Sequence, residues 1–460
     1  MNYQGVHIGK RLRMLVFLPI LIAALFSAQS EAQNINAGEV RGTVTDTTGA
    51  AVPHAAVSLT NSDTGVTTKV TADGEGVYDV PQLTPGTYNI VVEAKGFNEF
   101  VAQNVLLRNA PIQQNAVLQV GDVGEKITVN AGDMVQLQTE DSEQNLTMDE
   151  TTVTSLPNVG NAWWNETVLI PGVNGGGSQN QNGASIGING AESYQQNFLL
   201  NGGTATLVGS QNPDWIIAPT DFLSETNFET HDFNANSGGG LAILNVITKN
   251  GTNRYHGSVW DYNQNSAFAA QNYFSGGSGV PPLSSNTFGG EASGPIKRDK
   301  LFFFGGFQRQ LSTSGTVGIG SVPTANMKQG DFSGLATIFD PATTTTADGK
   351  TTRQAFQGNM IPAARMSQQA KNWEQFFPDP NFGDAGATTN NYRYSEQVND
   401  LTYWYTAKFD YNLNNKHHFN TSGTYGTVTF PNPSILNPIG EFAEFGHEYA
   451  AQVSYTWIPT

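Results

Sequence analysis

Short runs in which apolar and polar residues alternate fill residues 38–118. The apolar members include Val40, Val44, Val57, Leu59, Tyr88, Ile90 and Val92. A period of two is typical of strands with one buried face, and turns rich in Asp, Gly and Pro separate the runs. We therefore predict an all-β domain over residues 38–118, most simply a seven-stranded sandwich of two packed sheets.

A second kind of alternation fills residues 252–460. Its runs are about ten residues long, and one face is rich in Tyr and Trp. The residues on this face include Tyr403, Tyr405, Phe409, Tyr411, Phe419, Tyr425, Tyr449, Val453, Tyr455 and Trp457, and Asn414-Asn415 marks a tight turn. This pattern is typical of transmembrane β-strands with aromatic girdles. A soluble sandwich or solenoid with aromatic ribs is the alternative.

Residues 312–400 lie between these runs and are rich in Pro, Gly, Thr and Asp, with little periodicity. A stretch of this length without structure is unusual inside a compact domain. Long extracellular loops are normal in outer-membrane barrels. The contrast favours the barrel.

The N-terminus has the pattern of a secretory signal peptide. Lys10, Arg11 and Arg13 precede an almost entirely apolar run that ends near Phe26, and Ala32 supplies a small residue for cleavage. The apolar run is shorter than the ~20 residues that span a bilayer, which disfavours the alternative of a membrane anchor. We predict that residues 1–32 are removed and that the protein is exported.

Between the two β regions the composition changes twice. Residues 136–251 are rich in Asn, Gly, Gln and Thr, with short apolar runs, and predict a compact α/β unit with few helices. Residues 119–135 form a linker with one β-prone run, which starts at Glu125. An exposed run of this kind could add a strand to the sheet of a partner. It could equally be the last strand of the sandwich or a plain linker.

Charge and cysteine content exclude several classes of protein. The 460 residues carry a net charge of -17, which argues against a nucleic-acid partner, because such a partner requires a basic surface. The chain has no cysteine, so disulfides, thiolate zinc sites, iron–sulfur clusters and a lipid-anchored N-terminal Cys are excluded.

No catalytic, cofactor or metal site is expected. His447-Glu448 begins a zinc-protease motif, but Ala451 stands where the second His must be. Gly349-Lys350-Thr351 resembles a phosphate loop, but Thr344 occupies the position of its first Gly. His417 and His418 are neighbours on a predicted strand, so they point to opposite faces and cannot share one metal ion.

The first β region resembles the carboxypeptidase regulatory-like domain, a prealbumin-like sandwich grouped with carbohydrate-binding-like folds. The resemblance rests on Gly42-Thr43-Val44-Thr45-Asp46, on residues 52–57, on Asp73-Gly74-Glu75-Gly76-Val77-Tyr78, on residues 83–88 and on Lys95-Gly96-Phe97. In that family the module accompanies a catalytic domain and is not one, so the resemblance implies no peptidase activity.

The order of signal peptide, sandwich, α/β unit and long alternating strands is similar to that of the Oar-like TonB-dependent receptors of bacterial outer membranes. Several motifs carry this resemblance, in the family's order. The first is the segment 237–253, and 255–258, 272–274, 286–290 and 294–305 follow it. The last three are Val322-Pro323-Thr324, Gly330-Asp331-Phe332-Ser333 and Asn359-Met360-Ile361-Pro362. One departure is Asn201, where the family usually has Asp.

The resemblance implies a mainly β fold: an N-terminal prealbumin-like β-sandwich, an α/β plug over 136–251, and a partial transmembrane antiparallel β-barrel over 252–460. It also implies a place in the outer membrane among its lipids, and a mechanism in which TonB and its inner-membrane energising complex pull on a short periplasmic box. The plug then rearranges and a bulky ligand passes. The box expected here is Glu125, Lys126, Ile127, Thr128 and Val129.

Length sets a further expectation. Plugged transporters use about 22 strands, whereas only about six can be found after Gly251, so the chain is expected to be the truncated, N-terminal part of a longer receptor. Two other functions stay open. One is a surface protein that binds carbohydrate or peptide without transport, and the other is an extracellular enzyme, for which no set of catalytic residues is found.

Overall fold

The computed structural model describes residues 37–109, 111–121, 126–130, 144–155, 167, 169–180, 183–190, 195–205, 218–231, 242–271, 273, 280–432 and 442–458. The described residues form three parts: the sandwich (37–130), the inner unit (144–250) and the long sheet with its distal loop (256–458). The signal peptide predicted over 1–32 lies outside the described residues. Among the described helices, none has the length and apolar character needed to cross a membrane.

The sandwich consists of two packed sheets. One holds β1 (Gly38–Asp46), β4 (Val77–Leu83), β7 (Pro111–Gln113) and β8 (Ala116–Leu118), and the other holds β3 (Thr67–Thr71), β2 (Ala56–Asn61), β5 (Gly86–Glu93), β6 (Glu99–Leu107) and β9 (Lys126–Asn130). The alternating apolar positions named above are buried between the sheets. Nine strands are present where the periodicity predicted seven. The short β7 and β8 carry too few residues to show a period, and β9 follows the expected end of the domain.

The inner unit is built on a five-stranded sheet. Its strands lie in the order β10 (Gln144–Asp149), β15 (Leu223–His231), β16 (Ile243–Thr248), β13 (Asn197–Leu200) and β14 (Gly203–Thr204). A separate hairpin pairs β11 (Val173–Asn180) with β12 (Gly183–Ile188), and the helical turns are α2 (Glu150–Ser155) and η5 (Thr220–Phe222). Every residue of β16 is buried, in agreement with the apolar run predicted there. The unit is therefore mixed α/β with little helix.

Within the described residues, the long sheet contains six strands, each antiparallel to the next along the chain. They are β17 (His256–Asn265), β18 (Leu283–Lys297), β19 (Leu301–Gly320), β22 (Tyr392–Asn414), β23 (His417–Asn432) and β24 (Phe442–Trp457), with η7 (Ser266–Phe268) after β17. The turn predicted at Asn414-Asn415 is confirmed, since the Asn414 side chain accepts hydrogen bonds from the backbone N–H groups of Lys416 and His417. Within the described residues β17 and β24 are the edges, so the sheet is open.

The distal loop, residues 321–391, joins β19 to β22. It holds α3 (Ala325–Lys328), η8 (Pro341–Thr343), the hairpin β20 (Thr345–Ala347)–β21 (Lys350–Thr352), η9 (Gln357–Asn359), η10 (Ala363–Arg365) and α4 (Gln368–Glu374). Asn359 accepts a hydrogen bond from the backbone of Ile338 and donates to the carbonyl of Phe332. The expectation that residues 312–400 have no structure of their own is therefore wrong. Its ends belong to β19 and β22, and side chain–backbone bonds, which leave no periodic trace, order the rest.

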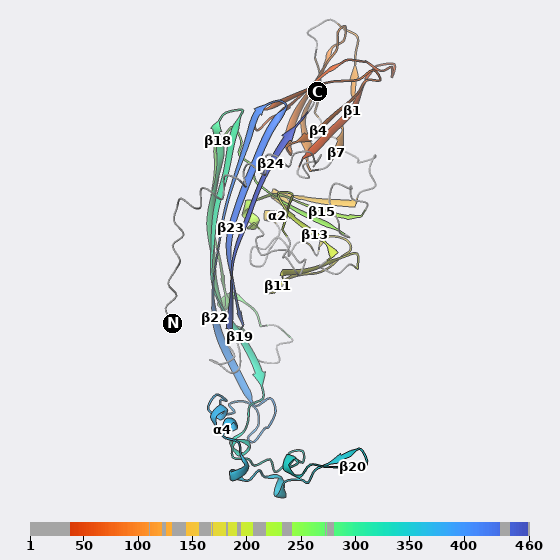
Figure 1. Cartoon of the computed structure of the whole chain (residues 1–460). Coiled ribbons are helices and arrows are strands. Elements are labelled where there is room, and N and C mark those ends of the chain that lie inside the picture. Colours follow the sequence, from red (N-terminus) through yellow and green to blue (C-terminus); the bar gives the residue numbers. More distant parts are fainter. Residues whose placement is uncertain are drawn as a thin grey trace, which may run out of the picture.

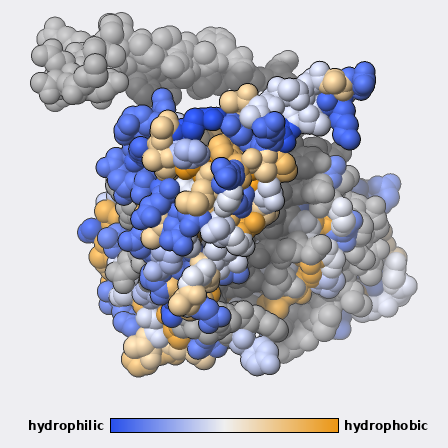
Figure 2. Space-filling view, turned by 90° about the horizontal axis from the view of Figure 1, so that it is seen from below, coloured by the Kyte–Doolittle hydropathy of each residue, from blue (hydrophilic) through white to orange (hydrophobic). Residues whose placement is uncertain are grey.

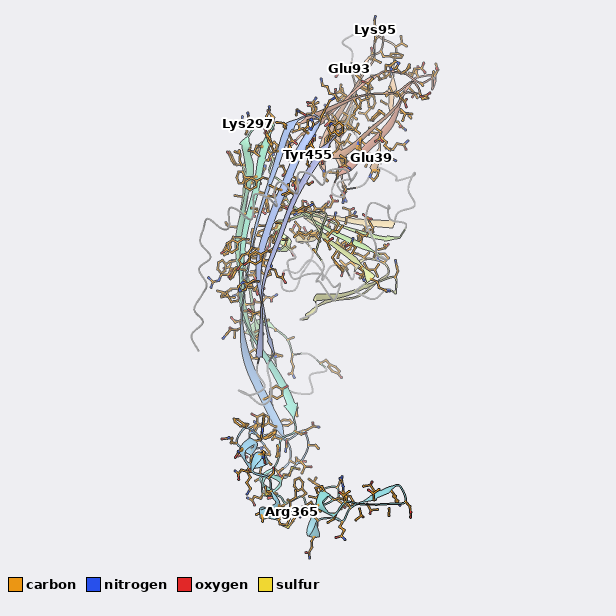
Figure 3. The ribbon with its side chains drawn as sticks, in the orientation of Figure 1. Glu39, Glu93, Lys95, Lys297, Arg365 and Tyr455 are labelled. Carbon is orange, nitrogen blue, oxygen red and sulfur yellow. The ribbon has the colours of Figure 1, made fainter. Side chains whose placement is uncertain are left out.

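The sandwich and the inner unit are both arranged along the strands of the long sheet (Figure 1). The sandwich lies at one end, the distal loop at the other, and the inner unit lies against one face of the sheet. Figure 3 places Lys297 and Tyr455 near the sandwich and Arg365 in the distal loop. The tight turns, 298–300 and 415–416, lie at the sandwich end, and the distal loop lies at the opposite end. Seen from the distal end, hydrophilic residues cover much of the described surface, with apolar residues between them (Figure 2).

Candidate functional site

The two faces of the long sheet have opposite character. On β22 and β24, alternate side chains facing away from the inner unit are apolar and exposed, among them Tyr405, Phe409 and Val453, the last with 80% of its surface exposed. The residues between them, such as Thr402, Thr406 and Lys408, are polar and buried. Strands β22 and β24 thus present apolar side chains outward and polar side chains inward, as the alternation predicted, whereas β19 also directs the apolar Phe302 and Phe304 inward. A water-soluble sheet that packs on its own core has the reverse arrangement.

The outward aromatic side chains gather at two levels. At one level Tyr425 lies between Tyr405 and Tyr449, with ring centroids 6.2 and 4.8 Å apart. At the other, Phe419 lies between Tyr411 and Tyr455, at 6.4 and 4.8 Å. The levels are six residues apart on β22, or roughly 20 Å along the strand. Two aromatic bands around an apolar belt are the arrangement found where barrels meet the two surfaces of a membrane.

The inner unit is pinned to the wall formed by β17–β19. The ring of Phe222 packs edge-on against Phe304 and Trp260, each with centroids 5.9 Å away. Gly306 makes this possible, because a Cβ there would lie 2.5 Å from the Phe222 ring. Any side chain at position 306 would therefore displace the Phe222 ring.

An ionic contact adds to the packing of Phe222, which we call the Phe222 pin. The Nζ atom of Lys249 lies 2.7 Å from Glu291 of β18 and 2.9 Å from Glu150 of α2. Burial alone would lower the pKa of Lys249, but hydrogen bonds to Glu291 and Glu150 raise it above its ordinary value. Lys249 is therefore held as a cation between the inner unit and the wall.

Asn201 joins two strands of the inner unit. It adopts a positive φ of 51°, and its Oδ1 atom accepts hydrogen bonds from the backbone N–H and the hydroxyl of Thr248, each at 2.9 Å. The carbonyl of Thr248 in turn accepts a bond of 3.3 Å from Lys408 of β22. An amide satisfies this position without an added charge. The structure thus gives the Asn that departs from the family pattern a structural role.

The sandwich is docked on both other parts. Asn253, between β16 and β17, donates to the carbonyl of Thr64 at 2.6 Å and to Asp299 at 2.7 Å. Arg108 forms an ion pair with Asp149 of β10. Because these residues come from the sandwich, the inner unit and the turn between β18 and β19, their contacts fix the three parts relative to one another.

A buried carboxyl lies at the same junction. Glu225 of β15 is buried beside the sandwich, and its Oε1 atom accepts a hydrogen bond from the backbone of Asn109 at 3.3 Å. Burial raises the pKa of Glu225, against the opposing effects of this hydrogen bond and of Arg108. Burial at this junction therefore favours the protonated form of Glu225.

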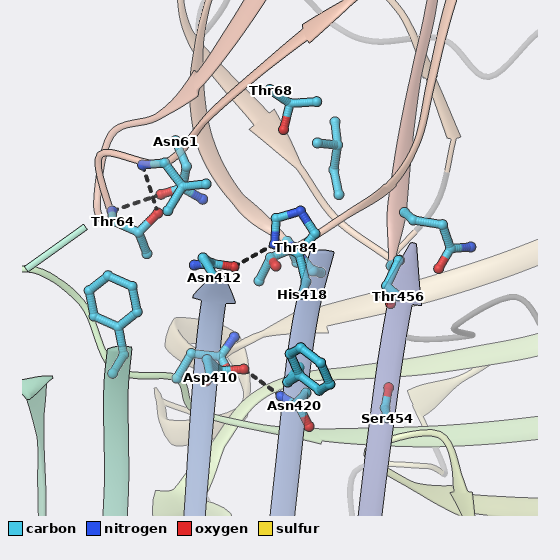
Figure 4. Close-up of a pocket in the computed structure, with 18 of the residues that line it drawn as sticks. Asn61, Thr64, Thr68, Thr84, Asp410, Asn412, His418, Asn420, Ser454 and Thr456 are labelled. Carbon is cyan, nitrogen blue, oxygen red and sulfur yellow. Dashed lines mark hydrogen bonds between the residues drawn. The ribbon is translucent and has the colours of Figure 1, made fainter. Parts of the chain in front are cut away.

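A pocket of about 100 Å³ lies where the sandwich covers the ends of β22, β23 and β24 (Figure 4). Thr64, Thr68 and Thr84 line it from the sandwich, and the strand residues that line it include Asp410, Asn412, His418, Asn420, Ser454 and Thr456. The side-chain oxygens Oδ1 of Asn250 and Oδ2 of Asp410 have no hydrogen-bond partner among the described residues. A polar space with unsatisfied acceptors is suited to bound water or a polar ligand.

The predicted partner-binding run lies in the sandwich. Lys126, Ile127, Thr128 and Val129 belong to β9, which pairs in parallel with β6, while Glu125 lies outside the described residues. Thr128 is exposed and Val129 packs on the sandwich core. Within the described residues no strand pairs with the second edge of β9. The structure thus realises the alternative of a last sandwich strand, and the role as a TonB box stays a prediction.

The two neighbouring histidines point to opposite faces, as expected. The ring of His417 contacts the outward Tyr455, and the ring of His418 contacts the inward Asn412. Among the described residues, no group of three acidic or His side chains could hold a metal ion.

The contacts of Phe222, Lys249 and Asn253 are not predictable from the sequence pattern. Each depends on a partner far away in the chain, and none repeats with a period. A signal did exist for Lys408, a charged residue on the polar face of an otherwise aromatic strand. Such a residue must face a polar interior or a partner.

Comparisons with known families agree with this architecture. Residues 247–460 match the outer membrane beta barrel domain, and residues 39–119 match the carboxypeptidase regulatory-like domain. The chain is therefore mainly β and combines these two domains.

Among curated proteins, the chain is similar to the TonB-dependent transporter Oar of Myxococcus xanthus. The two are 26% identical over 266 residues, which are 52% of this chain and 23% of the relative. The chain thus spans less than a quarter of the length of the curated relative that it matches.

Two solved structures are also similar to parts of the chain. A ferric enterobactin receptor from Pseudomonas aeruginosa is 12% identical with a TM-score of 0.33, covering 62% of this chain and 33% of the receptor. A putative carbohydrate binding protein from Bacteroides uniformis is 16% identical with a TM-score of 0.17, covering 18% of this chain and 41% of that protein.

Proposed function

We propose that this chain is part of a TonB-dependent receptor of the bacterial outer membrane, in which the long sheet forms part of the barrel wall and the inner unit is the plug. A bulky ligand crosses when the plug rearranges. The observation that carries the proposal is the reversed polarity of the long sheet, which presents its aromatic face outward and its polar face to the inner unit. Lipid is the solvent that such an outer face requires.

The open sheet supports a larger barrel. Plugged barrels use about 22 strands, and the described residues supply six of them. We propose that further strands close the wall around the inner unit. The tight turns at the sandwich end then face the periplasm, and the distal loop faces the outside, as in outer-membrane barrels generally.

We further propose Glu125, Lys126, Ile127, Thr128 and Val129 as the TonB box, through which an inner-membrane complex supplies energy. The free edge of β9 supports this assignment, since strand addition requires an unpaired edge. As a strand of the docked sandwich, the box would also lie on the periplasmic side, and the chain continues from it to β10, an edge strand of the plug.

Fractionation of cells that produce the protein tests the proposed location. We expect the protein in outer membranes, where salt and alkaline washing do not release it. Recovery of the folded protein in the soluble periplasmic fraction would exclude the transport function.

Proline substitutions test the box. Alternate residues of a strand direct their N–H groups to opposite edges, so Ile127→Pro and Thr128→Pro remove donors from different edges of β9. We expect only one of them to abolish capture of the protein by the periplasmic domain of TonB, the other serving as its matched control. Undiminished capture by both variants would show that the box lies elsewhere.

A further inference from the structure

The inner unit contacts the two halves of the long sheet, β17–β19 and β23–β24, in different ways. On the side of β17–β19 the contacts are closed by the Phe222 pin and the Lys249 ion pairs. On the side of β23 and β24, Ala450 packs against the core of the inner unit, but the described residues leave space beside it. A cavity of about 240 Å³ lies there, between the β13–β14 turn and the two strands.

Uncharged side chains line this cavity, most of them small, with the larger Leu200 and Tyr449 among them. The described residues around it include Gly203 and Thr204 of the inner unit and Ser422, Thr424, Ala450 and Gln452 of the wall. The Oε1 atom of Gln452 is buried without a hydrogen-bond partner among the described residues. A Cβ added at Gly203 would meet that oxygen at 3.5 Å, an ordinary contact, whereas Gly306 on the other side has no such room.

The cavity continues toward the sandwich as a row of inward-facing positions, which are polar except for Ala450. Four successive pairs face inward from β23 and β24, namely Thr424–Ala450, Ser422–Gln452, Asn420–Ser454 and His418–Thr456. The first two pairs line the cavity, and the last two line the pocket beneath the sandwich. We call these eight residues the polar track.

We infer that the polar track is the route of the ligand past the plug, and that the plug stays attached to β17–β19 while it opens toward β23 and β24. This inference rests on the proposed transport function. The two pairs at the cavity offer hydroxyl and amide groups, and Lys408 and Asp410 line the pocket at the other end, so the track suits a polar ligand that forms hydrogen bonds. The track ends beneath Thr64, Thr68 and Thr84, so the sandwich covers its periplasmic end (Figure 4).

Single cysteines test the track, because the chain has none of its own. Thr424→Cys places a thiol on the track, and Thr287→Cys places one on the inner face of β18. The two threonines are matched, with 5% and 6% of their surfaces exposed. Ser422→Cys and Ser293→Cys form a second pair at one level of the sheet, since strand register connects them through Phe304 and Lys408. The second pair decides the question if a threonine variant fails to fold.

The probe is 2-sulfonatoethyl methanethiosulfonate, a small water-soluble thiol reagent, added to outer membranes of cells that produce the protein. We expect Thr424→Cys and Ser422→Cys to react at least tenfold faster than Thr287→Cys and Ser293→Cys. Ala450→Leu, which fills the cavity, should slow the reaction of Thr424→Cys at least fivefold.

Equal rates on the two sides, or no effect of Ala450→Leu, would overturn the inference. If the protein resides in the outer membrane but the rates are equal, the track is wrong and the transport function survives. If the protein is absent from the outer membrane, the proposed function itself fails.

Discussion

The sandwich and the long sheet share the same alternation of apolar and polar residues. The apolar face is buried in the sandwich, whereas it is exposed in the long sheet. Val57 of the sandwich is fully buried between two sheets, whereas Val453 of the long sheet has 80% of its surface exposed. In the sandwich, water surrounds the polar face and the apolar faces pack on each other. In the long sheet the polar face contacts the inner unit and the apolar face has no protein against it within the described residues.

This comparison shows that period-two alternation determines which side chains share a face but not which solvent that face meets. Additional features distinguish the two regions. The strands of the sandwich have five to nine residues, apart from two very short ones, whereas those of the long sheet have ten to 23. The exposed face of the long sheet also carries ring stacks at two levels, which the surface of the sandwich does not need.

The largest effect is expected inside the sandwich. Leu59→Ala removes a fully buried side chain and leaves a cavity, which should lower the free energy of unfolding by about 2–5 kcal/mol. Leu106→Ala on β6 is the matched control, since Leu106 is 48% exposed and should change stability by less than about 0.5 kcal/mol. Pulse proteolysis of the sandwich in increasing urea measures both. A similar loss in the two variants would contradict the assigned core.

A charge on the outward face of the long sheet should lower the free energy of unfolding by nearly as much. Val453→Lys places an ammonium group in the apolar belt, which destabilises a membrane barrel by about 2–4 kcal/mol near the bilayer centre. Val120→Lys is the control in a water-exposed position, because Val120 is 78% exposed and a change there should stay within about 0.5 kcal/mol. Denaturant titration of the protein in lipid vesicles compares them. Equal tolerance of both lysines would mean that the outward face meets water.

The ionic contact of the inner unit should have an intermediate effect. Lys249→Gln removes charge-assisted hydrogen bonds and leaves the half-buried Glu291 without its cation, which should cost about 1.5–3 kcal/mol. Hydrogen exchange of the amides of β16 measures the loss as faster exchange. Lys297→Gln, at the exposed end of β18, is the matched control. Unchanged protection of β16 in Lys249→Gln would show that the pin alone holds the unit.

The smallest effect concerns pH. Because burial raises the pKa of Glu225, the folded protein binds the proton of this group more tightly than the unfolded chain does. The free energy of unfolding must therefore fall as the pH rises from the ordinary carboxyl value through the raised one. We expect the melting temperature of Glu225→Gln to exceed that of the parent increasingly over this window. A difference that does not vary with pH would mean that folding leaves the pKa of Glu225 unchanged.

The sequence was sufficient for the features that repeat. The alternation at Val40, Leu59 and Ile90 predicted the sandwich core, and the alternation from Tyr403 to Tyr411 predicted the outward face of β22. Side-chain chemistry also predicted the turn after Asn414. In each case the information lies within about ten neighbouring residues, where strand geometry alone decides the outcome.

The candidate site could not be predicted in this way. Phe222 requires the glycine at position 306, and Asn253 requires Thr64, which lies 189 positions earlier in the chain. Only the packing of whole units brings these partners together. The distal loop was misjudged for a related reason, since it is ordered by bonds such as those of Asn359 to backbone groups more than twenty residues away.

Whether lipid covers the outward face is the central question, and a single cysteine answers it most directly. Val453→Cys, in the protein as its host produces it, is exposed to a charged maleimide and to a membrane-dissolved one, with Val120→Cys as the water-exposed comparison in cells whose outer membrane is made permeable. If lipid covers the outward face, Val453→Cys reacts only with the membrane-dissolved reagent, while Val120→Cys reacts readily with the charged one. Rapid reaction of both cysteines with the charged reagent would contradict a lipid-covered face.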